Sequence, residues 1–448
     1  MWSIPALPRS GTAKSWSVSA SCTSSAVSTP CPSAATATSG SSRTSLSGGG
    51  SEMRLAVIAY EDLSRYNGAI VQLVELCENL AALGHSVTLY NPGHGRFPRP
   101  VKFKIRYVPV IDLPLLRNLS YLIMSIPCLA AGFLRDRPER AVLSEYYLDP
   151  VPALACAVFG VPMTFFVNGI VSEDMTLPSA LKPVMWLINL VQKFNCAMSA
   201  AVLAITDEVG LDLRERHGFP RECIEVLHDG VDPEKFRPMD SSALRAELGI
   251  AAGAPVTGFV GGLFKWHGLD YLVEAVPLVL KELPEARFLI VGGGPLGESL
   301  KALAVERGVR DAFIFTGRVP YEEVPRHINV FDLCICFFKG PRKNPGDPVK
   351  TYEYLACGKP VLASSVKGYG DFVERVGAGV SVDASDPAQA AAAILKLLKA
   401  PALRAELAGR GRLEVEKKHT WLRRAGQMAA FLEKASSRGA AARRGEAS

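Results

Sequence analysis

The sequence predicts an α/β protein built from two facing Rossmann-like domains, with the active site in the cleft between them. From residue 53 onward, short runs of β-branched residues alternate with helical segments, and nearly every strand position is apolar. Such strands are typical of a parallel sheet that helices cover on both faces. The alternation stops at a polar link (229–238) and then begins again, which indicates a second domain. Open α/β sheets bind ligands beyond the carboxyl ends of their strands, so two facing sheets predict a site between them.

The first domain is expected to alternate strands with helices along its whole length. The expected strands are 54–59, 86–90, 103–108, 141–145, 162–168, 200–205 and 224–228. The helices expected between them include 69–83, 181–196 and 207–217. Gly84 ends the first of these helices, because glycine readily closes a helix before a following strand.

The second domain repeats the same rhythm. Its expected strands are 256–260, 287–291, 312–315, 333–337, 361–363 and 379–382, with helices such as 269–283 and 387–399 between them. We therefore divide the chain into a first domain at 53–235, a second at 236–418 and a helix at 419–434 that packs back on the first domain. Residues 435–448 are expected to be a disordered tail. The Ser- and Thr-rich residues 1–52 are either a disordered extension or the product of a start codon assigned too early.

A short helix in DPVKTYEYLACGKPVLAS (347–364) has an unusual beginning. Asp347 is a good N-cap residue and Pro348 suits the first helical position. The exposed N–H groups of such a helix end favour an anion, and Lys350 adds a full positive charge. Glu353 lies one turn further along the same face. The segment is therefore either a capped surface helix with an ion pair or part of an anion-binding site.

Charge and cysteine content exclude several classes of function. The net charge is +6, but the two chain ends carry nearly all of the excess, so nothing indicates nucleic acid binding. The ten cysteines form no CxxC pair and no Cys/His set with zinc spacing, which predicts no metal site. Buried, reduced thiols in a cytoplasmic protein are the expected state.

VGGGPLG (291–297) contains the G-x-G-x-x-G pattern of dinucleotide-binding proteins, so a Rossmann oxidoreductase must be considered. The pattern follows the second strand of its domain, whereas the fingerprint follows the first. Pro295 lies inside it, and Gly317-Arg318 occupies the place where an acidic residue should follow. We expect a tight turn that lets the next helix pack closely.

Five segments of the second domain carry a family resemblance. They are GFVGGLFKWHGLDYLVEAV (258–276), RFLIVGGGP (287–295), FIFTGRVPYEEVP (313–325), FDLCICFF (331–338) and VKTYEYLACGKPVLAS (349–364). In this order and spacing they resemble the retaining glycosyltransferases of family four, also called glycosyl transferases group one, whose fold is named GT-B. Segments 66–90 and 200–238 of the first domain resemble the same family more weakly. The resemblance covers about residues 53–434.

The resemblance implies an enzyme that moves a sugar from a nucleotide-diphosphate sugar to a hydroxyl acceptor with retained anomeric configuration. The donor is expected on the second domain, and a glycan or lipid-linked acceptor on the first. No cofactor or metal is expected. Synthesis of cell-envelope or other glycoconjugates in the cytoplasm, at the membrane face, fits such a chain. A catalytically decayed GT-B scaffold and, less favoured, an oxidoreductase are the alternatives.

The resemblance also implies site residues. The donor-binding candidates are Asn67, Gly68, His267, Arg318, Lys350, Thr351 and Glu353, and the catalytic candidates are Asn168, Lys265 and Asp347. Glu353 would accept hydrogen bonds from the ribose hydroxyls, as a carboxylate can from a diol. Lys350 would lie near the phosphates at the helix N-terminus. Asn168 stands where many relatives carry a histidine, and an amide can hold a hydroxyl but cannot act as a general base.

The sequence departs from the family pattern at three charged positions. The second acidic residue of the family falls at Pro345, so Asp347 is either the N-cap or the contact to the donor sugar. The family's phosphate-binding arginine and lysine fall at Gly262 and His267. Lys265 is the candidate for compensating the leaving diphosphate, and a solvated loop lysine is the alternative. His267 either donates to a phosphate or packs beside the neighbouring tryptophan.

Two apolar helices leave a further question open. They are SYLIMSIPCLAAGFL (120–134) and LKPVMWLINLVQKF (181–194). Arg117 and Pro127 argue against a membrane-spanning helix in this part of the chain. Burial against the sheet is the simpler explanation. Shallow docking on the cytoplasmic face of a membrane, to reach a lipid-linked acceptor, is the alternative.

Overall fold

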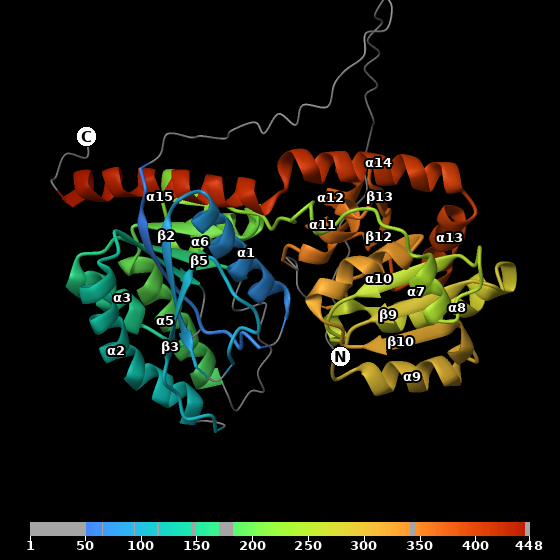
Figure 1. Cartoon of the computed structure of the whole chain (residues 1–448), viewed down its shortest axis with the longest axis horizontal. Coiled ribbons are helices and arrows are strands. Elements are labelled where there is room, and N and C mark those ends of the chain that lie inside the picture. Colours follow the sequence, from blue (N-terminus) through green and yellow to red (C-terminus); the bar gives the residue numbers. More distant parts are fainter. Residues whose placement is uncertain are drawn as a thin grey trace, which may run out of the picture. The chain divides into compact units, whose positions relative to one another are not determined.

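The computed structural model describes residues 51–443 except for 65, 94, 114–115, 145–147, 170–181 and 341–345. Within them lie two parallel β-sheets, one of seven strands and one of six, and helices cover the sheets (Figure 1). Each sheet with its helices is a Rossmann-like domain, so the predicted fold class is confirmed. Every strand that the sequence predicts is present. The predicted position of the active site between the domains stays a prediction.

The first sheet has the strand order β3-β2-β1-β4-β5-β6-β7. Its strands are β1 (Arg54–Ile58), β2 (Ser86–Pro92), β3 (Lys104–Val108), β4 (Arg140–Ser144), β5 (Met163–Val167), β6 (Ala201–Ala204) and β7 (Ile224–Val226). The helices of this domain are α1 (Gly68–Ala82), α2 (Leu116–Asp136), α3 (Val151–Phe159), α5 (Lys182–Met198) and α6 (Asp207–His217). The central strands β1, β4, β5 and β6 are almost wholly buried, which explains their continuous apolar sequences.

The second sheet has the order β10-β9-β8-β11-β12-β13. Its strands are β8 (Val256–Val260), β9 (Arg287–Val291), β10 (Phe313–Gly317), β11 (Leu333–Cys336), β12 (Val361–Ser364) and β13 (Gly379–Val382). The accompanying helices are α7 (Ser242–Glu247), α8 (Leu269–Glu282), α9 (Gly297–Glu306), α10 (Val324–Val330), α11 (Val349–Ala356), α12 (Gly370–Arg375), α13 (Pro387–Leu398) and α14 (Pro401–Lys418). In both sheets the strand order reverses beside the first strand of the domain, and the crevice at such a reversal is where doubly wound folds bind ligands.

The last helix, α15 (Trp421–Arg443), belongs to the second half of the sequence but packs against α1 of the first domain (Figure 1). The Arg140 guanidinium donates to the carbonyl oxygen of Leu432 at 3.3 Å, and Gln427 donates to the carboxylate of Glu225 at 2.8 Å. These bonds join the helix to β4 and β7.

Two expectations about helix ends are wrong. The C-terminal helix continues to Arg443, so the start of the expected disordered tail is helical. Alanine-rich sequence after 434 explains this, because alanine has the highest helix propensity. The short helix after β11 begins at Val349, one residue later than expected, because Pro348 is still extended with φ −82° and ψ 103°.

Candidate functional site

The loops after β8 and β11 meet at the strand reversal of the second sheet and hold several of the predicted site residues. The loop after β8 carries Lys265 and His267, on a short 3₁₀ helix at Lys265–His267. The connection after β11 leads through Asp347 into α11, which carries Lys350 in its first turn. The topology therefore brings residues about 80 positions apart to one end of the sheet.

Lys350 and His267 are in direct contact. The Lys350 ammonium lies 3.3 Å from Nδ1 of His267 and 4.3 Å from the centre of the Phe259 ring. Because an ammonium can only donate, the imidazole nitrogen accepts this hydrogen bond. Burial lowers the pKa of Lys350 to about 8. Burial, and then the charge of Lys350, hold the pKa of His267 well below its usual range. The pair therefore carries one positive charge, on lysine, at neutral pH.

The backbone next to Lys350 is open because of glycine. Gly261, which follows β8, has φ +143°, and a Cβ atom there would lie 3.0 Å from the Lys350 ammonium nitrogen. A side chain at this position would be strained and would crowd the lysine head group. The glycine thus leaves room for the Lys350 ammonium beside the backbone.

The N-termini of two helices lie close together beside this pair. Asn67 caps α1, and its side-chain oxygen accepts from the Ile70 N–H at 2.9 Å. A Cβ atom on Gly68, the first residue of α1, would lie 3.8 Å from the Val349 side chain at the start of α11. One helix end from each domain therefore contributes partial positive charge to the same region, which favours an anion.

Glu353 lies one turn further into α11, and its side chain is only 5% exposed. The hydroxyl of Tyr321 donates to it at 2.8 Å. Burial raises the pKa of Glu353 to about 7, against the opposing effects of the Tyr321 hydrogen bond and the charges of Lys235 and Lys350. The carboxyl group is therefore near its midpoint at neutral pH.

Aromatic and charged groups that the sequence analysis did not assign surround Glu353. Tyr66 of the first domain stacks on Tyr321 with ring centres 5.1 Å apart. The ammonium of Lys235, from the segment between the domains, lies 4.2 Å from the centre of the Tyr321 ring and 3.6 Å from the carboxylate of Glu75. Tyr321 lies in the quoted segment 313–325, but nothing in one sequence indicates that its hydroxyl donates to a carboxylate of α11.

Asp347 is not the N-cap of α11, so that interpretation is wrong. Pro348 occupies the cap position, and no side chain caps this helix end. The Asp347 carboxylate instead accepts from the Asp229 N–H at 2.8 Å and the Tyr352 hydroxyl at 2.9 Å, and it lies 3.2 Å from Nδ1 of His228. Because Pro348 is extended, the aspartate turns toward the segment that links the domains.

Asp229 extends this network to the first domain and to α15. Its buried carboxylate accepts from the side-chain amide of Gln72 at 2.7 Å, and its carbonyl accepts from the Arg424 guanidinium at 3.2 Å. Burial, and next the charge of Asp347, raise the pKa of Asp229. The network fixes the link between the domains. A sugar-binding role of Asp347 stays a prediction, and it would require part of this network to give way.

The remaining predicted residues have no recorded contact with the Lys350–His267 pair. The Thr351 side chain is buried, and its hydroxyl lies 3.3 Å from the sulfur of Cys336 in β11. Lys265 and Arg318 are exposed, and the stem of Arg318 lies over the glycine-rich turn beside Gly293. Asn168 is half-buried directly after β5.

The glycine-rich turn 291–297 has a packing role. A Cβ atom at Gly292, where φ is +136°, would collide with the carbonyl oxygen of Gly261. A Cβ atom at Gly294 would lie 2.7 Å from the backbone of Leu263, whose N–H donates to the carbonyl of Gly293 at 3.3 Å. The glycines let this turn touch the loop after β8, as expected for a tight turn. Because this loop also carries His267, the glycines indirectly support the position of that side chain.

Within the described residues, no group of three or more His, Cys, Asp or Glu side chains could hold a metal ion. One described helix, α2, is long and apolar enough to cross a membrane by length and composition, and 28% of its apolar window is buried.

Known proteins are similar to this chain in both halves. The family model described as Glycosyl transferases group 1 matches residues 240–414, and the model described as Glycosyltransferase Family 4 matches residues 66–235. A 2-deoxystreptamine glucosyltransferase of Streptomyces kanamyceticus is 27% identical over 354 residues, which are 74% of this chain and 90% of that protein. A D-inositol 3-phosphate glycosyltransferase of Thermobispora bispora is 29% identical over 358 residues, which are 75% of this chain and 82% of that protein.

A solved structure has the same fold. The Anabaena protein HepE, crystallised with UDP and glucose, superposes with a TM-score of 0.68 at 16% identity and covers 85% of this chain and all of its own length. Together the two family models span about three quarters of the sequence, one on each Rossmann-like domain. The chain is therefore a GT-B glycosyltransferase and belongs to glycosyltransferase family four, the glycosyl transferases group 1.

Proposed function

We propose that this protein transfers a sugar from a nucleotide-diphosphate sugar to a hydroxyl acceptor and retains the anomeric configuration. The observation that carries the proposal is the contact between Lys350 and His267 at the strand reversal of the second sheet. A half-buried ammonium beside a neutral imidazole and two helix N-termini is a site for a compact anion. The diphosphate of a donor is such an anion, and HepE, which has the same fold, was crystallised with UDP and glucose.

In this proposal Lys350 takes over the charge that the family places in the loop after the first strand of the second domain. That loop has Gly262 and His267 where the family has an arginine and a lysine. Lys350 comes from a different element but meets His267 in space. Lysine suits a diphosphate because its ammonium acts as a point charge with three donors. Lys265 is exposed, which favours the solvated-lysine alternative for that residue.

Glu353 would hold the donor by accepting hydrogen bonds from the two hydroxyls of its ribose. The Tyr321 hydroxyl donates to one carboxylate oxygen of Glu353. A ribose diol would replace or share this hydrogen bond, so the tyrosine hydroxyl keeps the buried acid satisfied until the donor arrives. Asn168, at the carboxyl end of β5, would position a hydroxyl group rather than accept its proton.

The transfer would proceed on one face of the sugar. The C1–O bond to the diphosphate breaks while the acceptor oxygen bonds to C1 from the same side, and a leaving phosphate oxygen takes the acceptor's proton. The protein then mainly positions the reactants and stabilises the developing negative charge, which Lys350 and the helix ends would do. No cofactor enters this scheme.

We also propose a cytoplasmic location and a role in cell-envelope or other glycoconjugate synthesis. The eight cysteines among the described residues are free thiols, and most are buried. Reduced thiols in this number are typical of cytosolic proteins, whereas secreted proteins form disulfides.

The first test is a thermal-shift measurement of the full chain with UDP, GDP, ADP and a nicotinamide dinucleotide. A ligand that binds only the native state raises the unfolding temperature by mass action. We expect a shift with one nucleoside diphosphate, which Glu353→Ala removes and Glu322→Ala, an exposed glutamate nearby, retains. A shift with the dinucleotide alone would contradict the proposal and favour an oxidoreductase.

A measurement of turnover distinguishes an active enzyme from a catalytically decayed scaffold. With the matching nucleotide sugar, an active enzyme releases nucleoside diphosphate slowly by donor hydrolysis even when the acceptor is unknown. Binding without any such release, and without transfer to envelope extracts, would identify the scaffold alternative.

A further inference from the structure

Large apolar side chains gather on the outer surface of one helix layer in the first domain. The layer consists of α2, α3 and α5, with α3 packed against both others. Of the twenty large apolar side chains exposed in the described part of the chain, twelve lie on these three helices. We define the apolar face by its most exposed members on each helix, Ile123, Ile126 and Leu134 of α2, Val158 of α3, and Trp186 and Leu190 of α5.

Burial against the sheet explains only the inner side of these helices. On α2, Tyr121, Leu129 and Phe133 are buried in the core, whereas Ile123 and Ile126 are more than half exposed. A surface helix of a globular protein normally carries polar residues on its outer side. The apolar face breaks this rule on three neighbouring helices, which indicates contact with an apolar phase or partner.

The charges around the face select a partner. Helices α3 and α5 contain no acidic residue, and the single acid of α2, Asp136, is paired with Arg106 at 2.6 Å. Arg135 and Lys193 are exposed beside the apolar side chains. An apolar surface with basic neighbours and almost no free acid is complementary to anionic phospholipid head groups over an acyl layer.

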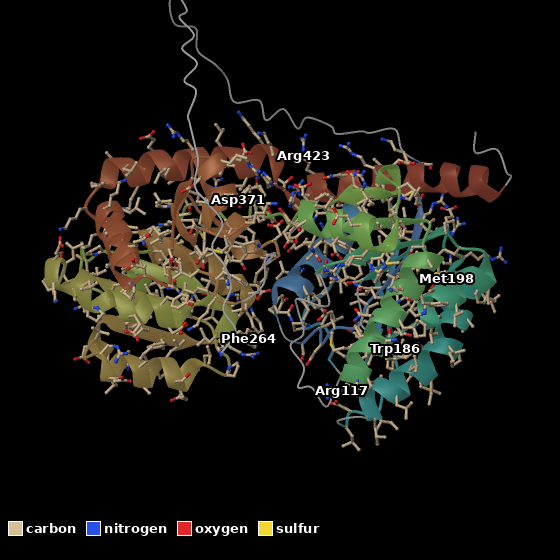
Figure 2. The ribbon with its side chains drawn as sticks, turned by 180° about the vertical axis from the view of Figure 1, so that it is seen from behind. Arg117, Trp186, Met198, Phe264, Asp371 and Arg423 are labelled. Atoms are coloured by element: carbon tan, nitrogen blue, oxygen red, sulfur yellow. The ribbon has the colours of Figure 1, made fainter. Side chains whose placement is uncertain are left out.

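Trp186, which Figure 2 labels on α5, supports the same partner. The residue is 66% exposed on α5, and Leu187 and Leu190 of the same helix are nearly half exposed. An indole has an apolar ring and one N–H donor, so it is most stable at the boundary between acyl chains and water.

The helices would lie on the bilayer rather than cross it. Although α2 is long enough to span, Phe133 packs against Tyr90 and Phe159 with ring centres 6.1 and 5.6 Å apart. A Cβ atom on Gly132 would collide with Tyr90, so the helix is fitted closely to the sheet. A spanning helix would remove these side chains from the core, whereas a helix parallel to the surface keeps them there.

We propose that the apolar face docks on the surface of an anionic phospholipid bilayer and brings the enzyme to a membrane-borne acceptor. The docking stands on the face itself, and only the acceptor class rests on the proposed function. A second copy of this chain is the competing occupant, and the experiment separates the two.

The test is co-sedimentation of the full chain with vesicles of phosphatidylcholine alone and of phosphatidylcholine mixed with phosphatidylglycerol. We expect binding to the mixed vesicles, reduced at least about tenfold by Trp186→Glu and by Ile123→Glu. Val305→Glu is the matched control, because Val305 is 63% exposed on α9 of the other domain. Lys193→Gln should weaken binding to the mixed vesicles about fivefold and leave binding to neutral ones unchanged.

A second measurement guards against unfolding. Brominated phospholipid should quench the fluorescence of Trp186 in the wild type. Trp186→Phe should retain vesicle binding but lose this share of the quenching. The nucleoside-diphosphate thermal shift should persist in all face variants, which separates a docking failure from a failure of the proposed function. Three outcomes would overturn the proposal. The wild-type protein could fail to bind the mixed vesicles, or Trp186→Glu could bind them equally well. The protein could also form a stable dimer that Trp186→Glu dissociates.

Discussion

The two domains share one topology but have different outer surfaces. Both sheets place their first strand in the interior of the sheet, and the strand order reverses beside it. In the second domain, Glu274 and Glu282 of α8 form ion pairs on the outside with Arg307 and Lys399, the residues that follow α9 and α13. In the first domain, the helices α2, α3 and α5 carry the apolar face instead. The buried positions determine the topology, so the outer positions can differ according to whether that surface contacts water or an apolar partner.

The two domains also contribute different residues to the candidate donor site. The second domain supplies Lys350 and Glu353 from α11 and His267 from the short 3₁₀ helix after β8, at one end of its sheet. The first domain supplies Gly68 and Tyr66, which approach α11 and Tyr321. Each domain thus contributes residues from the carboxyl end of its sheet to the same region.

The largest effect is expected for Glu353→Ala. Losing the carboxylate that would hold the ribose should lower kcat/KM about 1,000-fold, at the upper end for a single positioning contact. The measurement is the initial rate with the nucleotide sugar found by thermal shift, with Glu322→Ala as the control. Circular dichroism and the unfolding temperature should show a folded protein. A rate within tenfold of the wild type would remove Glu353 from the site.

The next effect concerns stability in the second domain. Gly292→Ala forces a residue at φ +136° into the Gly261 carbonyl and should lower the free energy of unfolding by about 3 kcal/mol. Gly308→Ala is the matched control, because φ is +68° there but no atom lies within 4 Å of the added Cβ. We expect a loss of about 1 kcal/mol for the control. Urea titrations measure both, and equal losses would contradict the packing role of the turn.

Lys350→Met and Lys265→Met test which of the two lysines binds the diphosphate. If Lys350 compensates the diphosphate, its loss should weaken nucleoside-diphosphate binding about 30-fold, the size of one strong charge-assisted contact. The exposed Lys265 should contribute less than about threefold. Isothermal titration gives both values, and the opposite ranking would restore Lys265 as the phosphate-binding residue.

The smallest effect is a pH dependence. The Lys350 ammonium is charged below its pKa of about 8, and the Glu353 carboxylate is ionised above its pKa of about 7. Because binding needs both charged forms, kcat/KM should be highest between these values and fall several-fold on either side. Lys350→Met should flatten the alkaline limb, and Glu353→Gln the acid limb. A flat profile from pH 6 to 9 would show that neither group titrates in the free enzyme.

Within the site, some residues were predictable and others were not. Glu353, Lys350 and Gly68 lie in segments whose order resembles a family, so sequence was enough to single them out. Tyr321 and Lys235 could not be found in this way, because their importance arises from contacts between loops distant in the sequence. Asp347 shows the limit most clearly. Its local sequence favours a cap, and only the extended Pro348 sends its carboxylate to Asp229 instead.

The sequence by itself determined the two-domain architecture and all the strands, because buried parallel strands must be apolar and the turns between them need glycine and proline. Only the tertiary structure decided which charges meet and which apolar residues stay outside. The pairing of Lys350 with His267 depends on strand order, and the apolar face depends on which side of α2 and α5 the sheet covers. A helix that is apolar on both sides looks the same in sequence whether its second side is buried or exposed.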